Sequence, residues 1–175
     1  MTAISHLNVW SFGPCWSSRN RIAYFSHEGG NKLKLWTVLP DGSELRQITN
    51  RPGECRQPWW SPDGATLAFS ANDASERFQL WLSGGDGSGG HALTTAGDWQ
   101  QPFWSPDGRR LAVSAKFGDA KSQILVIDVS NSDAERIEQP EDNNVHPAWS
   151  PDGRSIVFTA GRGDGSALWR FDFQS

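Results

Sequence analysis

The sequence predicts an all-β fold, a β-propeller of four blades in which each blade contains four short strands and repeats about every 44 residues. Three observations lead to this prediction. A Trp-Ser pair recurs at nearly constant spacing, a Pro-Asp-Gly turn follows it in most copies, and short apolar segments keep the same phase in every copy. Four strands within a repeat of this length are typical of a propeller blade.

The first strand of each repeat ends in the Trp-Ser pair. Its tryptophans stand at positions 16, 60, 104 and 149, so the repeats are offset by 44, 44 and 45 residues. Three copies continue into Pro-Asp-Gly, at residues 62–64, 106–108 and 151–153, whereas the first copy reads Ser18-Arg19-Asn20. Proline, aspartate and glycine in this order favour a type I turn followed by a left-handed residue, which predicts a tight hairpin between the first two strands.

Three more segments follow each tryptophan at matching positions. The predicted second strands are apolar and lie at residues 22–25, 67–70, 111–114 and 156–159. The third strands are marked by residues 35–36, 80–81, 124–125 and 168–169. The fourth strands end at residues 48–49, 93–94 and 137–138, and the last repeat stops before this strand.

The missing fourth strand is expected from the beginning of the chain. Ile4-Ser5 lies twelve residues before Trp16, as Ile48-Thr49 lies twelve residues before Trp60. We therefore expect a single domain over residues 1–175 in which the N-terminal strand closes the last blade, because closure removes exposed sheet edges. Two arrangements satisfy this pattern. One chain forms a four-bladed ring, or two chains form an eight-bladed ring in which each N-terminal strand closes the partner's last blade.

Composition and charge narrow the classes of function. The net charge of −4 comes from acidic and basic residues mixed along the chain, so we expect no nucleic-acid partner. No apolar run is long enough for a membrane span. The N-terminus lacks a basic segment followed by an apolar one, so the sequence predicts a cytoplasmic location, or a periplasmic one if a signal peptide has been lost. Cys15 and Cys55 are expected to be free thiols, with a disulfide between them as the alternative.

Catalytic and metal-binding motifs are not recognisable. Residues 86–90 approach the Gly-x-Ser-x-Gly pattern of serine hydrolases, but Asp86 stands in place of the first glycine. The four histidines, at positions 6, 27, 91 and 146, fall in different phases of the repeat, so their spacing does not predict a shared metal site. We therefore expect no catalytic residues, no metal and no cofactor.

The repeats resemble the PD40 (WD40-like) repeat of TolB-like β-propellers. The resemblance rests on Pro-x-Trp-Ser-Pro-Asp-Gly, on the following Leu/Ile-Ala-Phe-type strand, and on the later Leu-Trp, Asp-Gly-Ser and Leu-Thr segments, and it covers essentially the whole chain. It implies a scaffold that binds proteins. Similar blades also gate peptidases or form a sugar-lyase scaffold, which leaves a carbohydrate- or small-molecule-binding propeller as the alternative.

The candidate binding residues lie in the variable connections between blades, because function concentrates on variable loops held by a rigid scaffold. For a protein or peptide partner, bound by a monomer or a homodimer, the expected contacts are Trp10, Glu54, Arg56, Trp99 and Asp142. Packing over the top of the ring is the alternative role for the two tryptophans. Gln57, Gln101 and His146 share one phase of the repeat and are expected to form a polar ring at the mouth of the central channel.

Overall fold

The computed structural model describes residues 3–4, 9–28, 30–73, 76–140, 143–162 and 165–173. Within these residues the secondary structure consists of strands in four antiparallel sheets, one for each predicted blade. Blade 1 contains β1 (Ser11–Trp16), β2 (Ile22–Ser26), β3 (Lys34–Val38) and β4 (Arg46–Gln47). Blade 2 contains β5 (Cys55–Trp60), β6 (Thr66–Ala71), β7 (Gln79–Gly84) and β8 (His91–Ala92). Blade 3 contains β9 (Asp98–Trp104), β10 (Arg110–Lys116), β11 (Gln123–Asp128) and β12 (Ala134–Arg136). Blade 4 contains β13 (Asn143–Trp149), β14 (Ser155–Arg162) and β15 (Gly165–Asp172).

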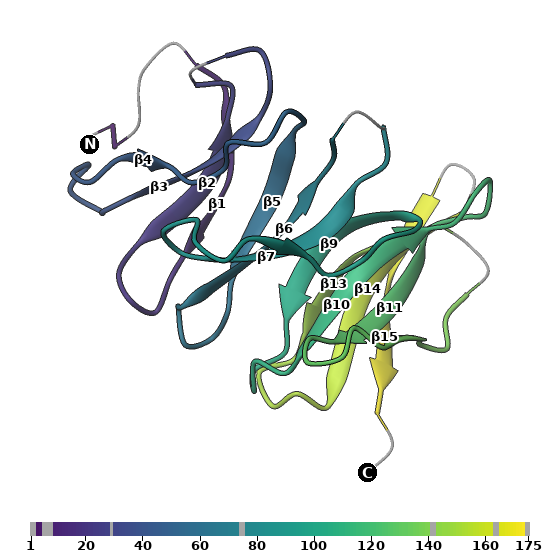
Figure 1. The fold of residues 1–175 in the computed structure, drawn as a ribbon. Helices are drawn as coiled ribbons and strands as arrows, with labels where there is room; N and C mark the ends of the chain where they lie inside the picture. The colour runs from purple at the N-terminus through teal and green to yellow at the C-terminus, as the bar shows by residue number, and fades with distance from the viewer. Residues whose placement is uncertain are drawn as a thin grey trace.

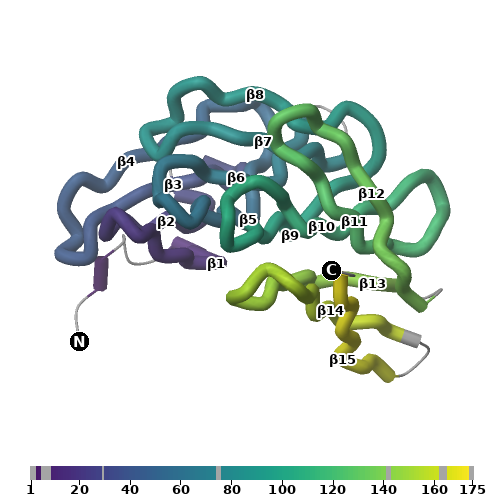
Figure 2. The backbone as a smooth tube through the Cα atoms, turned by 90° about the horizontal axis from the view of Figure 1, so that it is seen from below, coloured from purple at the N-terminus to yellow at the C-terminus, as the bar shows by residue number. Residues whose placement is uncertain are grey.

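The blades follow one another in an open arc. Their first strands, β1, β5, β9 and β13, contact one another in that order and line the inner side of the arc (Figure 2). Blade 1 and blade 4 form the two ends of the row (Figure 1). The prediction of an all-β fold with four blades is therefore confirmed. The described residues of the four blades form an arc (Figure 2).

The hydrophobic core lies between the blades rather than within each sheet. Trp60, Trp104 and Trp149 end the inner strands of blades 2 to 4, and each is only 6% exposed. Each of these tryptophans packs against apolar side chains of the preceding blade; Trp60, for example, shares one cluster with Leu35 and Ile48 of blade 1. A propeller blade buries its faces on its two neighbours, and this explains why the tryptophan recurs once per repeat.

The Ser-Pro-Asp-Gly turns have the geometry that their sequence predicts. In blade 2, the Gly64 amide donates to the Ser61 carbonyl at 2.8 Å, and Gly64 has a left-handed φ of +67°. The Asp63 carboxylate accepts hydrogen bonds from the Ser61 hydroxyl at 2.6 Å and from the Ala65 amide at 3.0 Å. The same serine–aspartate contact recurs at 2.6 Å in blades 3 and 4. These aspartates are therefore turn-forming residues.

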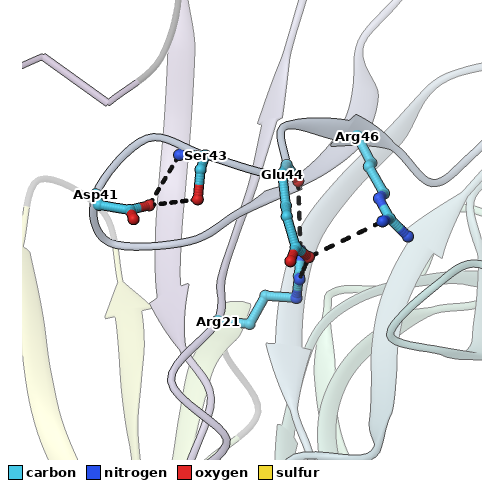
Figure 3. A network of polar contacts seen from close by, with 5 residues as sticks. All are labelled: Arg21, Asp41, Ser43, Glu44 and Arg46. Carbon is cyan, nitrogen blue, oxygen red and sulfur yellow. Dashed lines mark hydrogen bonds and ion pairs between the residues drawn. The ribbon is translucent and has the colours of Figure 1, made fainter.

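The turn between β3 and β4 is held by a second carboxylate (Figure 3). Asp41 accepts hydrogen bonds from both the hydroxyl and the amide of Ser43, at 2.6 and 2.9 Å. These bonds, the hydroxyl one foremost, hold the pKa of the Asp41 carboxyl below its ordinary value. Beyond the turn, the Glu44 carboxylate pairs with Arg21 and lies 3.9 Å from Arg46. The network ties the outer strand of blade 1 to the start of β2.

The last blade has three strands among the described residues, because none of them pairs with the outer edge of β15. The predicted closing strand falls on Ile4 and Ser5, and Ser5 lies outside the described residues. Ile4 itself packs on blade 1, against the cluster of Ile22, Tyr24 and Val38. Closure of blade 4 by the N-terminal strand thus remains a prediction.

Candidate functional site

Each inner strand is interrupted by a β-bulge at the same repeat position. Gly13, Gln57, Gln101 and His146 occupy these bulges, and their φ angles are +54°, +55°, +57° and +56°. The strand register shifts at each of them. A left-handed φ is uncommon for residues other than glycine, and bulges of this kind re-aim a side chain. The predicted common phase of Gln57, Gln101 and His146 therefore corresponds to a common backbone conformation.

The two glutamines at the bulges link neighbouring blades. The Gln57 Oε1 accepts a hydrogen bond from the backbone amide of Gln101 at 3.0 Å, and the Gln101 Oε1 accepts one from the backbone amide of His146 at 2.8 Å. The hydroxyl of Ser114 also donates to the Gln101 Oε1, at 2.8 Å. Sequence reasoning predicted these glutamines at the channel mouth. It did not predict that their side-chain oxygens would accept hydrogen bonds from the backbone of the next blade.

A cavity of about 380 Å³, called the channel pocket below, opens between the four inner strands. Its lining comes from the four bulge residues, from the prolines that follow them, and from three aromatic side chains and one alanine. These residues are Gly13, Gln57, Gln101 and His146, then Pro14, Pro58, Pro102 and Pro147, and finally Phe25, Trp59, Phe103 and Ala148. Trp59 and Phe103 are adjacent, with ring centroids 4.6 Å apart. The pocket is therefore mostly apolar, with polar groups confined to the bulges.

A stack of aromatic rings leads from the end of blade 1 to the channel pocket. The Trp10 ring, 75% exposed, stacks on Phe12 with the centroids 6.2 Å apart. Phe12 in turn stacks on Phe25, a pocket residue, at 5.5 Å. Trp10 thus offers an exposed ring at the outer end of this stack.

Trp99 has a different environment from Trp10. Its side chain is only 5% exposed and belongs to the core between blades 2 and 3. Its indole N–H donates to the carbonyl of Ala96, and Phe117 covers its edge with the centroids 5.4 Å apart. This burial gives Trp99 a packing role between the blades, and its contact with a partner stays a prediction.

Glu54 and Arg56 lie at the start of β5 and form an ion pair with each other. The Arg56 guanidinium also lies over the ring of Phe78, 4.8 Å from its centroid. Nearby, the Cζ atom of the Arg51 guanidinium lies 3.4 Å from the centroid of the Trp81 ring. Sequence reasoning missed this contact because Arg51 lies in the connection after β4, whereas Trp81 lies in β7 of the next blade. Asp142, the remaining expected contact, lies outside the described residues.

The two cysteines are free thiols buried in the core between blades 1 and 2. Burial raises the pKa of the Cys15 thiol to about 12 and also raises the pKa of Cys55. Among the described residues, which exclude His6, no three histidine, cysteine or acidic side chains gather as metal ligands would. In the same part of the chain, no helix is long and apolar enough to cross a membrane.

Comparison with known proteins gives partial sequence matches to TolB and to a peptidase. Residues 90–175 match the family model described as TolB beta propeller domain, PD40. The Tol-Pal system protein TolB of Nitratidesulfovibrio vulgaris is 44% identical over 64 residues, which are 36% of this chain and 14% of that protein. The uncharacterized peptidase YuxL of Bacillus subtilis is 30% identical over 69 residues, which are 39% of this chain and 10% of that protein.

Solved structures share the fold at low sequence identity. A putative TolB from Agrobacterium tumefaciens superimposes with a TM-score of 0.81 and 22% identity, over 97% of this chain and 60% of that one. An oligogalacturonate lyase in complex with manganese gives a TM-score of 0.76 and 18% identity, over 99% of this chain and 51% of that one.

Four sheets packed face to face, with bulged inner strands around a shared channel, define a repeat β-propeller. The matches indicate which propellers this one resembles: residues 90–175 are similar to the TolB beta propeller domain, PD40, and the chain has a TolB-like fold. It spans about a seventh or less of the curated relatives that it matches, and 60% or less of the two solved chains compared above. Because these structures include both TolB and a lyase, the fold alone does not assign an activity.

Proposed function

We propose that this propeller is a non-catalytic scaffold that binds a protein or peptide segment. The observation that carries the proposal is the continuous aromatic surface from exposed Trp10, through Phe12 and Phe25, into the channel pocket. An extended peptide crossing this surface would place an apolar side chain in the pocket, and Glu54 and Arg56 would offer charge on the neighbouring blade. Large rigid aromatic rings are common anchors in such interfaces.

The chemistry of the channel pocket supports binding over catalysis. Among the described residues that line the pocket, His146 is the one titratable residue and none carries a carboxylate. Acid–base chemistry at a substrate normally needs a positioned partner group. The oxygens of Gln57 and Gln101, which would otherwise contact a hydroxyl-rich ligand, already accept backbone hydrogen bonds.

The test is an array of immobilised random twelve-residue peptides, probed with the labelled chain. We expect retention on peptides that contain large apolar residues, and an F12S variant should lose most of that retention. An F117A variant is the matched control, because Phe117 is an exposed aromatic residue outside the stack. Binding to soluble oligosaccharides in place of peptides, measured by calorimetry and sensitive to H146A, would replace the proposal with the carbohydrate-binding alternative.

A further inference from the structure

Blade 1 differs from blades 2 and 3 where its first two strands line the channel pocket. In blade 3 the Ser114 hydroxyl donates to the Oε1 of the bulge residue Gln101 at 2.8 Å, and blade 2 has the same pair of residue types. In blade 1 these two positions hold Gly13 and Phe25. A Cβ added to Gly13 would lie 2.6 Å from a ring carbon of Phe25. The glycine therefore makes room for the ring, and blade 1 replaces a polar pair with an aromatic wall of the pocket.

The polar groups that the channel pocket leaves for a ligand are mainly hydrogen-bond donors. Every hydrogen bond that the side chains of Gln57 and Gln101 make to described residues uses Oε1. Because a backbone amide donates to an oxygen, these bonds fix the orientation of both side-chain amides. Each Nε2 group, with its two N–H donors, then has no acceptor among the described residues. His146, when neutral, adds one donor and one acceptor, so donors are in excess.

The rest of the pocket lining is apolar, and the cavity is small. Trp59 and Phe103 lie in the inner strands of blades 2 and 3 with their ring centroids 4.6 Å apart, and Phe25 adds a third ring from blade 1. The volume of about 380 Å³ is at the lower end of the usual range for ligand pockets, about 300–1,000 Å³. The pocket therefore has room for a short part of a peptide and favours uncharged groups.

On the basis of the peptide-binding function proposed above, we propose that the channel pocket selects a proline-containing segment. The carbonyl that precedes a proline accepts hydrogen bonds, which suits the free Nε2 groups of Gln57 and Gln101. The proline itself has no backbone N–H, so it needs no acceptor in the pocket. Its apolar ring packs on aromatic side chains, as in other aromatic-lined grooves that bind polyproline II segments. A residue that carries an N–H would bury a donor where few acceptors are free.

Isothermal titration calorimetry of the 175-residue chain with two capped hexapeptides tests the proposal. One peptide is Ala-Ala-Pro-Pro-Ala-Ala, and in the other peptide two valines replace the prolines. The exchange keeps the number of side-chain carbons and adds two backbone N–H groups. We expect the proline peptide to bind at least about tenfold more tightly, since a buried N–H without an acceptor costs about one such factor or more.

Equal affinities for the two peptides would overturn the proline preference and leave the peptide-binding scaffold standing. Tighter binding of the valine peptide would overturn it as well. If neither peptide binds, the preference is again wrong, and the peptide array described above decides the scaffold function independently.

Two variants test whether the preference arises in the channel pocket. Q57E keeps an oxygen for the Gln101 amide but replaces the Nε2 donor with a second oxygen, so it should weaken binding of the proline peptide about tenfold. F25S introduces the residue type that blades 2 and 3 have at this position and should also weaken binding about tenfold. N20D is the matched control for the added charge, because Asn20 lies in the turn after β1 and outside the pocket.

Circular dichroism melting shows whether each variant is folded, and N20D should bind the proline peptide as the wild type does. Unchanged affinity in Q57E would overturn the donor role of Gln57. Unchanged affinity in folded F25S would overturn the role of the aromatic wall. If F25S does not fold, the Q57E result alone decides the proposal.

Discussion

At the scale of the residue, repeat position decides the role of a side chain more than residue type does. From the sequence, the amide side chains of Gln57 and Gln101 are expected to face the channel, where they would be free to contact a ligand. In the structure, the Oε1 atom of each accepts a hydrogen bond from the backbone amide of the next bulge residue. The two tryptophans of the connections also differ, because Trp99 is buried between blades and Trp10 is exposed. These differences lead to two predictions about stability.

The variant Q101L should lower the free energy of unfolding by about 1–3 kcal/mol, because the amide of His146 and the hydroxyl of Ser114 lose their acceptor. Urea denaturation followed by circular dichroism measures this loss. The matched control is Q100L, whose side chain bonds Asp98 on its own strand instead of a neighbouring blade. Equal losses in the two variants would contradict the blade-linking role of Gln101.

The variant W99A should destabilise the chain by about 3–5 kcal/mol, the usual cost of truncating a large buried aromatic side chain. W10A should change stability little, since its ring is 75% exposed. Thermal denaturation of both variants under one buffer condition compares them directly. A large loss in W10A would show that the exposed aromatic stack is structural.

At the scale of the element, each blade is fastened by carboxylates at its turns. The Ser105 hydroxyl, with the Arg109 amide as a smaller contribution, holds the pKa of the Asp107 carboxyl below its ordinary value. The pKa values of the Asp63 and Asp152 carboxyls are also lowered, and the largest cause is the hydrogen bond from the hydroxyl of Ser61 or Ser150. The stability of these hairpins should therefore depend on pH through the ionisation of the turn aspartates.

A lowered pKa in the folded state means that the ionised carboxylate stabilises the fold. This stabilisation is complete above the ordinary aspartate value of 3.8 and is lost as the pH falls through the lower pKa of the folded chain. We therefore expect the urea midpoint to fall as the pH is lowered from 5 towards about 3. The variants S61A, S105A and S150A combined should flatten this dependence, and an unchanged slope would contradict the assignment.

At the scale of the whole molecule, the chain behaves as a row in which each blade contacts its neighbours. Blade 1 has one neighbouring blade within the row. Its packing on the row therefore depends on its contacts with blade 2. Repeat proteins of this kind unfold in parts when end units are less stable than the interior. The buried thiols of Cys15 and Cys55 lie in that interface and report its opening.

We expect these thiols to resist labelling by a disulfide reagent at pH 8 in the native chain, because burial raises the pKa of both groups. In a urea series, labelling should begin at lower urea than the loss of the β-sheet circular dichroism signal. The C15A and C55A variants assign the signal to each thiol. Coincident labelling and unfolding curves would instead show that all four blades unfold as one unit.

The sequence by itself determined the repeat architecture, because strand patterning and turn chemistry are local and recur at a constant spacing. The tryptophan period, the Ser-Pro-Asp-Gly hairpins and the strand order follow from neighbours in the chain, and the structure agrees with each. Sequence reasoning also placed Gln57, Gln101 and His146 in one phase of the repeat. It could not distinguish Trp10 from Trp99, since both stand in similar connections before an inner strand.

Tertiary structure alone decided what each side chain meets across a blade interface. The burial of Trp99, the engagement of the glutamine oxygens by the next bulge, and the continuity of Trp10 with the channel pocket all depend on contacts between strands far apart in the sequence. It also decided that the row of blades forms an open arc, with Trp16 and Leu168 exposed at its ends. The physical reason is that a repeat specifies its own strands locally, whereas the angle between neighbouring blades arises from side-chain packing at each interface.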